Sequence, residues 1–423
     1  MLLRFGVENF RSFRDPVELS LVGTRFKDAP DHRFSLGGLK HGVLPVAAIY
    51  GGNASGKSNL LAAIETMRAE VVGSFVDRKP GGKMRFSPFK LGDAAETPLT
   101  SFDIDFAVDG VRYSYGFRYD ATRVHEEWLY AFPEGYQQVW FHRNIAEDDP
   151  FYFGPNLLGR KQTIADLTRP NSLLLSAAAQ NNHRQLTPIY AWFAQRCAFS
   201  NSLMGRRFPV FREDSAILAP GRAALVRDLL ARADVGVSDF RSRDIPLPPA
   251  DSLRGLAPDV HEEVIAEISR SKALELGHVG PDGEPIYLNP SEESQGTHML
   301  LMHMNVILEV LQKGVLLVLD ELDASLHPRL SAALVAMFTD PESNPNGAQL
   351  VFSTHDETLI NSVRRDSVVF VQKDRVGNST VIPLAEFKTR ARDDLRRAYH
   401  EGRLGGTPVV GDLAAAIARH RVE

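Results

Sequence analysis

The chain has 423 residues, of which 43% are hydrophobic and 24% charged, and these proportions exclude an intrinsically disordered protein. No apolar run approaches the ~18 residues that a membrane-spanning helix needs, and no secretory leader is recognisable, so we expect a cytoplasmic protein without membrane contact. The net charge of −5 gives no overall attraction to nucleic acid, and the single cysteine, Cys197, excludes an internal disulfide.

The start of the chain predicts two short strands, followed by a strand, a glycine loop and a helix. Apolar and polar residues alternate over 3–7 and 17–21, on either side of the turn-like residues 9–13. A strand over residues 43–49 runs into a glycine pair, and residues 58–72 carry apolar side chains at helical spacing without internal proline or glycine.

The middle of the chain predicts an antiparallel sheet and then helices. Residues 101–119 alternate strictly on both sides of Asp109-Gly110, as in a hairpin, and residues 124–132 extend its sheet. Residues 171–196 are helical in pattern. Two further helices are predicted over residues 221–233 and 259–272, around a proline-rich stretch, and we interpret this region as a helical insertion.

The last third alternates helices with short apolar strands, a pattern typical of a parallel sheet covered on both faces. The expected elements are a helix over 297–312, a strand over 315–319, a helix after Pro328, and strands over 350–353 and 368–372. The fold class predicted for the chain is therefore α/β, with a mostly parallel core sheet flanked by helices, an antiparallel β subdomain and a helical insertion.

The strongest functional signal is Gly-Gly-Asn-Ala-Ser-Gly-Lys-Ser at residues 51–58, which matches G-x-x-x-x-G-K-[ST] between a predicted strand and a predicted helix. Backbone N–H groups in such a loop surround phosphates, the lysine reaches the β and γ oxygens, and the serine hydroxyl binds Mg²⁺. An ordinary glycine turn is the alternative. The candidate contacts with ATP are Gly51, Asn53, Ala54, Ser55, Gly56, Lys57, Ser58 and Asn59.

A second signal is the apolar strand over 315–319, which ends in Asp320-Glu321. At the carboxyl end of a parallel strand these carboxylates face the same crevice as the phosphate loop. Asp320, together with Ser58, is then a candidate Mg²⁺ ligand, and Glu321 is a candidate base that orients and deprotonates water. Without the phosphate loop, the same pair also fits a solvated strand end.

Two weaker signals follow the same order along the chain. His355 ends the strand over 350–353 and is a candidate γ-phosphate sensor, although a histidine at a strand end is often polar surface. Ser294 and Gly296 begin the helix over 297–312, and they fit either a helix cap or a second phosphate-facing helix start. Because one chain cannot easily fold this helix start onto its own loop, a second protomer is expected to supply it.

The order of phosphate loop, Ser-x-Gly helix start, Asp-Glu strand and strand-end histidine resembles the ABC ATPase head, in particular its SMC/RecF/OLD-like branch. Residues 9–13 (Asn-Phe-Arg-Ser-Phe) and 320–328 (Asp-Glu-Leu-Asp-Ala-Ser-Leu-His-Pro) are similar to motifs of that branch. The resemblance implies that Ser294 and Gly296 form the signature motif, that Glu321 is the catalytic base, that His355 is the switch histidine, and that Arg11 contacts ATP. Such heads act as ATP-bound dimers.

Some features depart from the family pattern. The signature reads Glu-Ser-Gln-Gly-Thr where transporters have Leu-Ser-Gly-Gly-Gln, and His327 stands where many D-loops carry an acid. Gln180 is the candidate for the Q-loop glutamine. The insertion lacks the sustained heptads of a long coiled-coil arm.

The chain most resembles compact prokaryotic ATPases of the RloA-like group found in phage-defence operons, through Leu-Leu-Leu-Ser at 173–176 and the tail over 399–408. That likeness implies a homodimer or higher oligomer that forms with ATP and regulates a separate effector, such as a nuclease. About seventy residues follow His355, fewer than the TOPRIM nuclease of OLD proteins needs.

The resemblance divides the chain into an N-terminal ATPase lobe (1–190), a helical insertion (191–275), a C-terminal ATPase lobe (276–385) and a helical tail (386–423). The alternative function is a RecF-like ATPase that acts directly on DNA, for which Arg392, Arg396 and Arg403 would line one side of a C-terminal helix. Acidic residues between these arginines also fit a solvated helix face.

Overall fold

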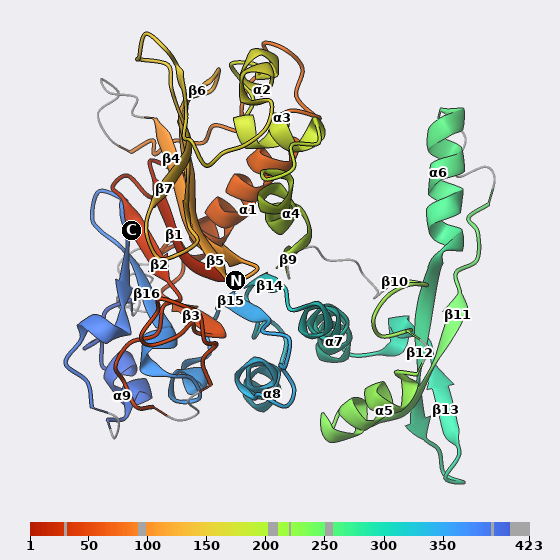
Figure 1. The fold of residues 1–423 in the computed structure, drawn as a ribbon. Helices are drawn as coiled ribbons and strands as arrows, with labels where there is room; N and C mark the ends of the chain where they lie inside the picture. The colour runs from red at the N-terminus through yellow and green to blue at the C-terminus, as the bar shows by residue number, and fades with distance from the viewer. Residues whose placement is uncertain are drawn as a thin grey trace, which may run out of the picture.

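The computed structural model describes residues 1–28, 32–91, 99–201, 210–219, 221–249, 257–390 and 393–406. Figure 1 shows an antiparallel sheet above a mostly parallel sheet, with a smaller sheet set apart on the far side of helix α7. Within these ranges, no helix combines the length and the apolar character needed to cross a membrane.

The parallel sheet forms the centre of the molecule. Its strand order is β17-β16-β3-β15-β14-β9, and every neighbouring pair except β16 with β17 is parallel. Each residue of β3, β14 and β15 is buried, which explains why these strands read as apolar runs without alternation. The strands are β3 (Val46–Tyr50), β9 (Cys197–Asn201), β14 (Leu316–Asp320), β15 (Gln349–Ser353), β16 (Val368–Lys373) and β17 (Ser379–Pro383).

Helices cover both faces of this sheet. Helix α1 (Lys57–Gly73) packs its apolar side chains into a core shared by the parallel and antiparallel sheets. The opposite face lies against α7 (Gln295–Lys313), α8 (Pro328–Thr339) and α9 (Leu395–His400). The predicted α/β class with a mostly parallel core sheet is confirmed.

The antiparallel sheet has the strand order β2-β1-β4-β5-β6-β7-β8. The predicted hairpin is present: Val108 pairs with Val111 across Asp109 and Gly110, which both have the positive φ that a tight two-residue turn requires. The strands are β1 (Leu2–Glu8), β2 (Val17–Ser20), β4 (Thr100–Val108), β5 (Val111–Tyr119), β6 (Val124–Phe132), β7 (Gln138–Asn144) and β8 (Phe151–Phe153).

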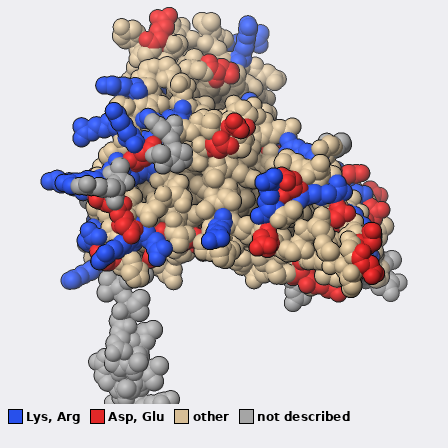
Figure 2. Space-filling view, turned by 90° about the horizontal axis from the view of Figure 1, so that it is seen from below, with Lys and Arg blue, Asp and Glu red and all other residues tan. Residues whose placement is uncertain are grey.

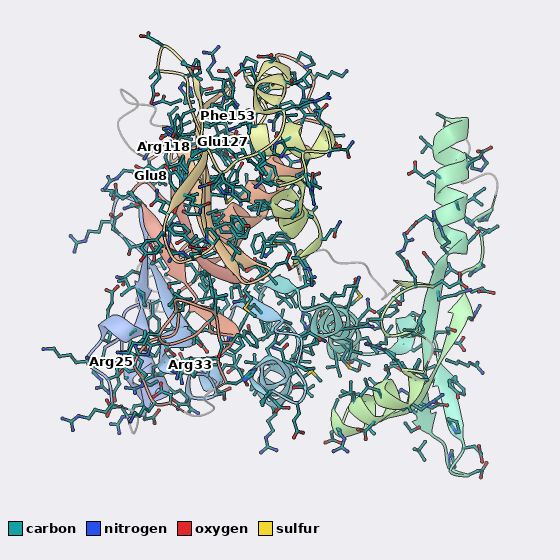
Figure 3. All side chains as sticks on the ribbon, in the orientation of Figure 1. Glu8, Arg25, Arg33, Arg118, Glu127 and Phe153 are labelled. Atoms are coloured by element: carbon teal, nitrogen blue, oxygen red, sulfur yellow. The ribbon has the colours of Figure 1, made fainter. Side chains whose placement is uncertain are left out.

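A buried glutamate fixes helix α3, one of three short helices beside this sheet, to its strands. Figure 3 places Glu127 in the upper part of the molecule, on the sheet that also carries Arg118 and Phe153. Its carboxylate accepts hydrogen bonds from the backbone N–H groups of Leu174 (2.6 Å) and Leu175 (3.0 Å) at the start of α3. The helices are α2 (Lys161–Leu167), α3 (Leu174–Gln180) and α4 (Thr187–Gln195), so the helical pattern over 171–196 belongs to two helices.

Most of a four-stranded antiparallel sheet also lies in the predicted helical insertion, and its last strand lies beyond residue 275. The two predicted helices are present. The strand over 237–244 lacks a long apolar alternation because the face that carries Phe240 continues with Ser242 and Asp244, which are polar and exposed. Strand β9 falls within the same predicted range, yet it joins the core sheet. The elements are β10 (Val210–Arg212), α5 (Ala223–Arg232), β11 (Val237–Asp244), α6 (Pro258–Ser269), β12 (Ser271–Val279) and β13 (Pro285–Leu288). The domain boundaries remain predictions.

Candidate nucleotide-binding site

The carboxyl ends of four parallel strands meet at one edge of the core sheet. Strand β3 leads there into the glycine loop, β14 into Asp320-Glu321, β15 into Ser353–His355 and β16 into Lys373. A pocket of about 520 Å³ opens at this edge. It is lined by Asn53, Ala54, Ser55, Gly56, Lys57, Ser58, Asn59, Glu321, His355 and Lys373.

The glycine loop leaves the start of α1 open toward the pocket. Gly56 is the N-cap of α1, with a φ of 118°, and no side chain caps the helix. A Cβ atom at Gly56 would lie 2.5 Å from the Ser379 hydroxyl oxygen, so only glycine fits the loop without displacing its support. Since the first N–H groups of a helix have no intrahelical partner, this end of α1 suits an anion.

Lys57 crosses the loop from the first turn of α1. Its Nζ donates hydrogen bonds to the carbonyl oxygens of Gly51 (2.7 Å) and Gly52 (3.2 Å), and the side chain is buried. Burial lowers the pKa of Lys57, while the nearby carboxylates of Asp320 and Glu321 oppose that shift. A cation held over the loop beside carboxylates can bind phosphate oxygens when they arrive.

The acidic pair and the glycine loop lie at the same edge. Asp320 is buried and accepts a short hydrogen bond from the Ser353 hydroxyl, and that hydroxyl oxygen accepts the Glu321 N–H at 2.8 Å. Glu321 has a φ of 55°, which is unusual for a residue other than glycine, and its side chain lines the pocket. Ser58 lines the pocket too, whereas Asp320 is not among its lining residues. Oxygen donors of the type that Mg²⁺ prefers therefore line it from α1 (Ser58) and from the segment directly after β14 (Glu321).

His355 reaches the pocket from the end of β15. Its backbone N–H lies 3.3 and 3.2 Å from the carboxylate oxygens of Asp323, which therefore ties the histidine loop to the segment after β14. Burial first, and then the charge of Lys57, lower the pKa of His355 below its ordinary value. The ring is therefore neutral at pH 7, where it has one N–H to donate.

Ser12 contacts the residues that hold the glycine loop, whereas Arg11 lies outside the pocket. The Ser12 hydroxyl accepts a hydrogen bond from Asn59 (2.9 Å), and the Ser379 hydroxyl donates to the Ser55 carbonyl (2.6 Å) within 2.9 Å of Ser12. Arg11 does not line the pocket: its guanidinium lies 3.5 Å from the Asn59 side-chain oxygen and borders a neighbouring groove along α1.

Ser294 and Gly296 are separate from the pocket. Ser294 is exposed and caps α7 by accepting the Thr297 N–H at 3.1 Å, as the helix-cap interpretation predicts. A Cβ atom at Gly296 would lie 2.8 Å from the Ser325 carbonyl oxygen, so α7 begins against the segment that follows Glu321. Neither residue lines the pocket of its own chain.

Several residues around the pocket had no predicted role. Lys373 lies at the end of β16 and lines the pocket, and Ser379 supports the loop from the neighbouring strand. Polar residues at the carboxyl end of each predicted parallel strand were the available signal for Lys373. Ser379 gave no comparable signal, because it begins β17, a strand that the sequence did not reveal.

Two weaker candidates lie elsewhere. The exposed side chain of Gln180 donates to the Tyr190 hydroxyl at 3.2 Å and does not line the pocket. The predicted arginine-lined helix is shorter than expected: α9 ends at His400, Arg403 lies beyond it and pairs with Glu401, and Arg392 lies outside the described residues. On the face shown in Figure 2, basic side chains stand in separate groups with acidic ones among them.

A glycine loop between a buried strand and an uncapped helix, facing two carboxylates from a second strand, defines a P-loop protein of the α/β class. The chain belongs to the family described as "AAA domain, putative AbiEii toxin, Type IV TA system", whose model matches residues 46–361. No curated protein matches the chain. Among solved structures it is similar to the SMC head domain from Thermotoga maritima, at 15% sequence identity and a TM-score of 0.39, over 90% of this chain and 98% of that chain.

Proposed function

We propose that the chain binds ATP with Mg²⁺ and hydrolyses it, and that ATP joins two copies into a dimer that regulates a separate effector protein in defence against phage. The observation that carries this proposal is the pocket where the glycine loop, Lys57, Glu321 and His355 meet. The family description, which names a toxin–antitoxin system, supports the connection with defence.

The residues of the pocket suit separate tasks in hydrolysis. Bound ATP·Mg²⁺ would supply the reactive phosphate and the divalent charge, with Ser58 and Asp320 as the protein ligands of the metal. The loop N–H groups and Lys57 would hold the phosphates in place. Glu321 would accept a proton from the attacking water, and neutral His355 would donate a hydrogen bond to the terminal phosphate.

The exposed start of α7 supports the dimer. Ser294 and Gly296 do not line the pocket of their own chain, and the resemblance to ABC heads implies that they close over the pocket of a second copy. The Gly296 contact with Ser325 would connect that helix start to the segment carrying Glu321. Each ATP would then contact two chains, so that ATP binding favours the dimer over the monomer. An effector that binds only one of these two forms would be regulated by ATP.

The test compares Glu321→Gln with the wild type in Mg²⁺ and ATP. We expect ATP binding to persist, phosphate release to fall about a hundredfold or more because the general base is lost, and a dimer to accumulate in light scattering. Glu134→Gln is the matched control, since Glu134 is exposed in the turn after β6. An unchanged rate of phosphate release in Glu321→Gln would remove Glu321 from this role, and a wild type that does not bind ATP would end the proposal.

A further inference from the structure

The segment after α9 returns to the start of the phosphate loop. The buried ring of Tyr399, on α9, stacks on Phe370 at 5.4 Å between centroids and meets Tyr50 edge-on at 5.8 Å. Tyr50 is the last residue of β3, directly before Gly51. The ring therefore packs against the residue at which the core strand becomes the loop.

The Tyr399 hydroxyl connects the two segments. It donates to the carbonyl oxygen of Gly406 at 3.3 Å, and Gly406 itself lies against the Cα atom of Gly51. The Gly51 carbonyl oxygen, on the other side of the same residue, accepts from Lys57 Nζ at 2.7 Å. The first residue of the loop thus lies between Gly406, which Tyr399 holds by a hydrogen bond, and the lysine that we expect to bind phosphate.

The turn after α9 makes this approach possible. Gly402, Gly405 and Gly406 all have positive φ, between 69° and 73°, and they bring the chain back over the loop. A Cβ atom at Gly406 would already be in van der Waals contact with the Gly51 Cα at 3.5 Å and with Phe370, so the additional carbon atoms of a larger side chain have little room beside the loop. A Cβ atom at Gly402 would meet no atom within 4 Å, although its φ is almost the same.

Helix α9 also contacts the other side of the site. The segment η3 (Glu357–Asn361) follows His355 closely along the chain, and α9 packs on it. His400 lies 3.3 Å from the Glu357 carboxylate, and Asn361 donates to Asp394, the N-cap of α9, at 3.4 Å. One short helix therefore touches both the start of the phosphate loop and the segment after the candidate sensor.

We propose that Tyr399 and the Gly405–Gly406 turn position the phosphate loop for nucleotide, by fixing the backbone of Gly51. This inference rests on the proposed ATP binding. Tyr399 is a positioning residue, since it acts through Gly51 and Lys57. A change in the C-terminal segment would then alter ATP affinity without touching a residue that contacts ATP, because small displacements of binding groups are costly.

The first experiment measures ATP affinity by calorimetry in two glycine variants. We expect Gly406→Val to weaken ATP binding about tenfold or more, because its branched side chain presses on Gly51. Gly402→Val is the matched control, with the same backbone strain and open space around it, and its affinity should stay within about twofold of the wild type. Equal affinities in the two variants, whether reduced or unchanged, would overturn the proposal.

The second experiment needs no nucleotide. Tyr399→Phe keeps the ring and removes the hydrogen bond to Gly406, so we expect faster deuterium uptake in the peptide that spans the phosphate loop, with the melting temperature close to the wild type. The control is Tyr136→Phe, at a tyrosine that is 80% exposed. Unchanged uptake in Tyr399→Phe would overturn the inference even if Gly406→Val does not fold. A wild type that fails to bind ATP would instead count against the proposed function, and the uptake result would still stand.

Discussion

Two helices of this protein begin with small polar residues and glycine, yet they differ in whether a side chain accepts hydrogen bonds from the backbone N–H groups of the first turn. Helix α1 begins at Gly56 without a side-chain cap, buried at the edge of the core sheet. Helix α7 begins at Ser294, whose exposed hydroxyl already accepts the Thr297 N–H. An uncapped buried helix start needs an outside partner, whereas a capped exposed one is stable without it. The first is therefore the candidate binding site within a single chain, and the second would need another chain to form one.

The largest effect is expected at the uncapped helix. Lys57→Ala removes the only cation that the described structure places over the glycine loop in hydrogen-bond contact with it, so we expect ATP affinity measured by calorimetry to fall about a hundredfold or more. Lys90→Ala, at an exposed lysine, should bind ATP like the wild type. If Lys57→Ala retains wild-type affinity, the start of α1 is not the phosphate site.

The sequence predicted this site because its parts follow rules that need only local information. A buried strand, a G-x-x-x-x-G-K-[ST] loop and a helix are read from consecutive residues, and Asp320 and His355 follow from the rule that parallel strands end at one edge. The structure brings Lys57, Glu321 and His355 to one pocket, as that rule requires. Their chemical roles remain predictions.

Contacts between distant segments could not be predicted in the same way. Ser379 and Tyr399 reach the loop from more than three hundred residues away in sequence, through a short strand and a six-residue helix with weak patterns of their own. The strands of the insertion were missed because β11 is polar on both faces after Phe240: Ser242 and Asp244 are exposed on one face. On the other face, Arg241 and Arg243 pair with Glu275 of the neighbouring strand. Side-chain pairing across a sheet is not visible in a single stretch of sequence.

Acidification should lower the free energy of unfolding through a buried histidine on α7. His303 is buried on α7, and burial lowers its pKa to about 4. In the unfolded chain this histidine is protonated below about pH 6.5, whereas in the folded chain it is protonated only below about pH 4. Stability should therefore be lost as pH falls through this window, by as much as about 3 kcal/mol from this residue. Urea unfolding of His303→Leu should show a flatter pH dependence between pH 7 and 4. An identical pH dependence would assign the acid sensitivity to other groups.

A smaller effect is expected where Ser379 supports the loop. Ser379→Ala removes the hydrogen bond to the Ser55 carbonyl, and we expect ATP affinity to fall about tenfold because the loop loses its fixed shape. Ser331→Ala is a suitable control, since Ser331 is equally buried on α8 and its hydroxyl has no hydrogen-bond partner among the described residues. If the two variants bind ATP equally, the support from β17 is structural only.

The smallest loss of stability is expected at the capped helix, where two variants test whether α7 has any role beyond its own stability. Ser294→Ala should cost about 1 kcal/mol in urea unfolding, because the Thr297 N–H loses its cap. Ser294→Asp keeps the cap but adds a negative charge, which would repel phosphates if this helix start closes over the pocket of a second copy. We therefore expect Ser294→Asp to retain the stability of the wild type and to lose dimer formation and hydrolysis in ATP. If Ser294→Asp hydrolyses ATP at the wild-type rate, Ser294 only caps α7. The start of α7 would then have a structural role alone, whereas the start of α1 would remain the candidate phosphate site.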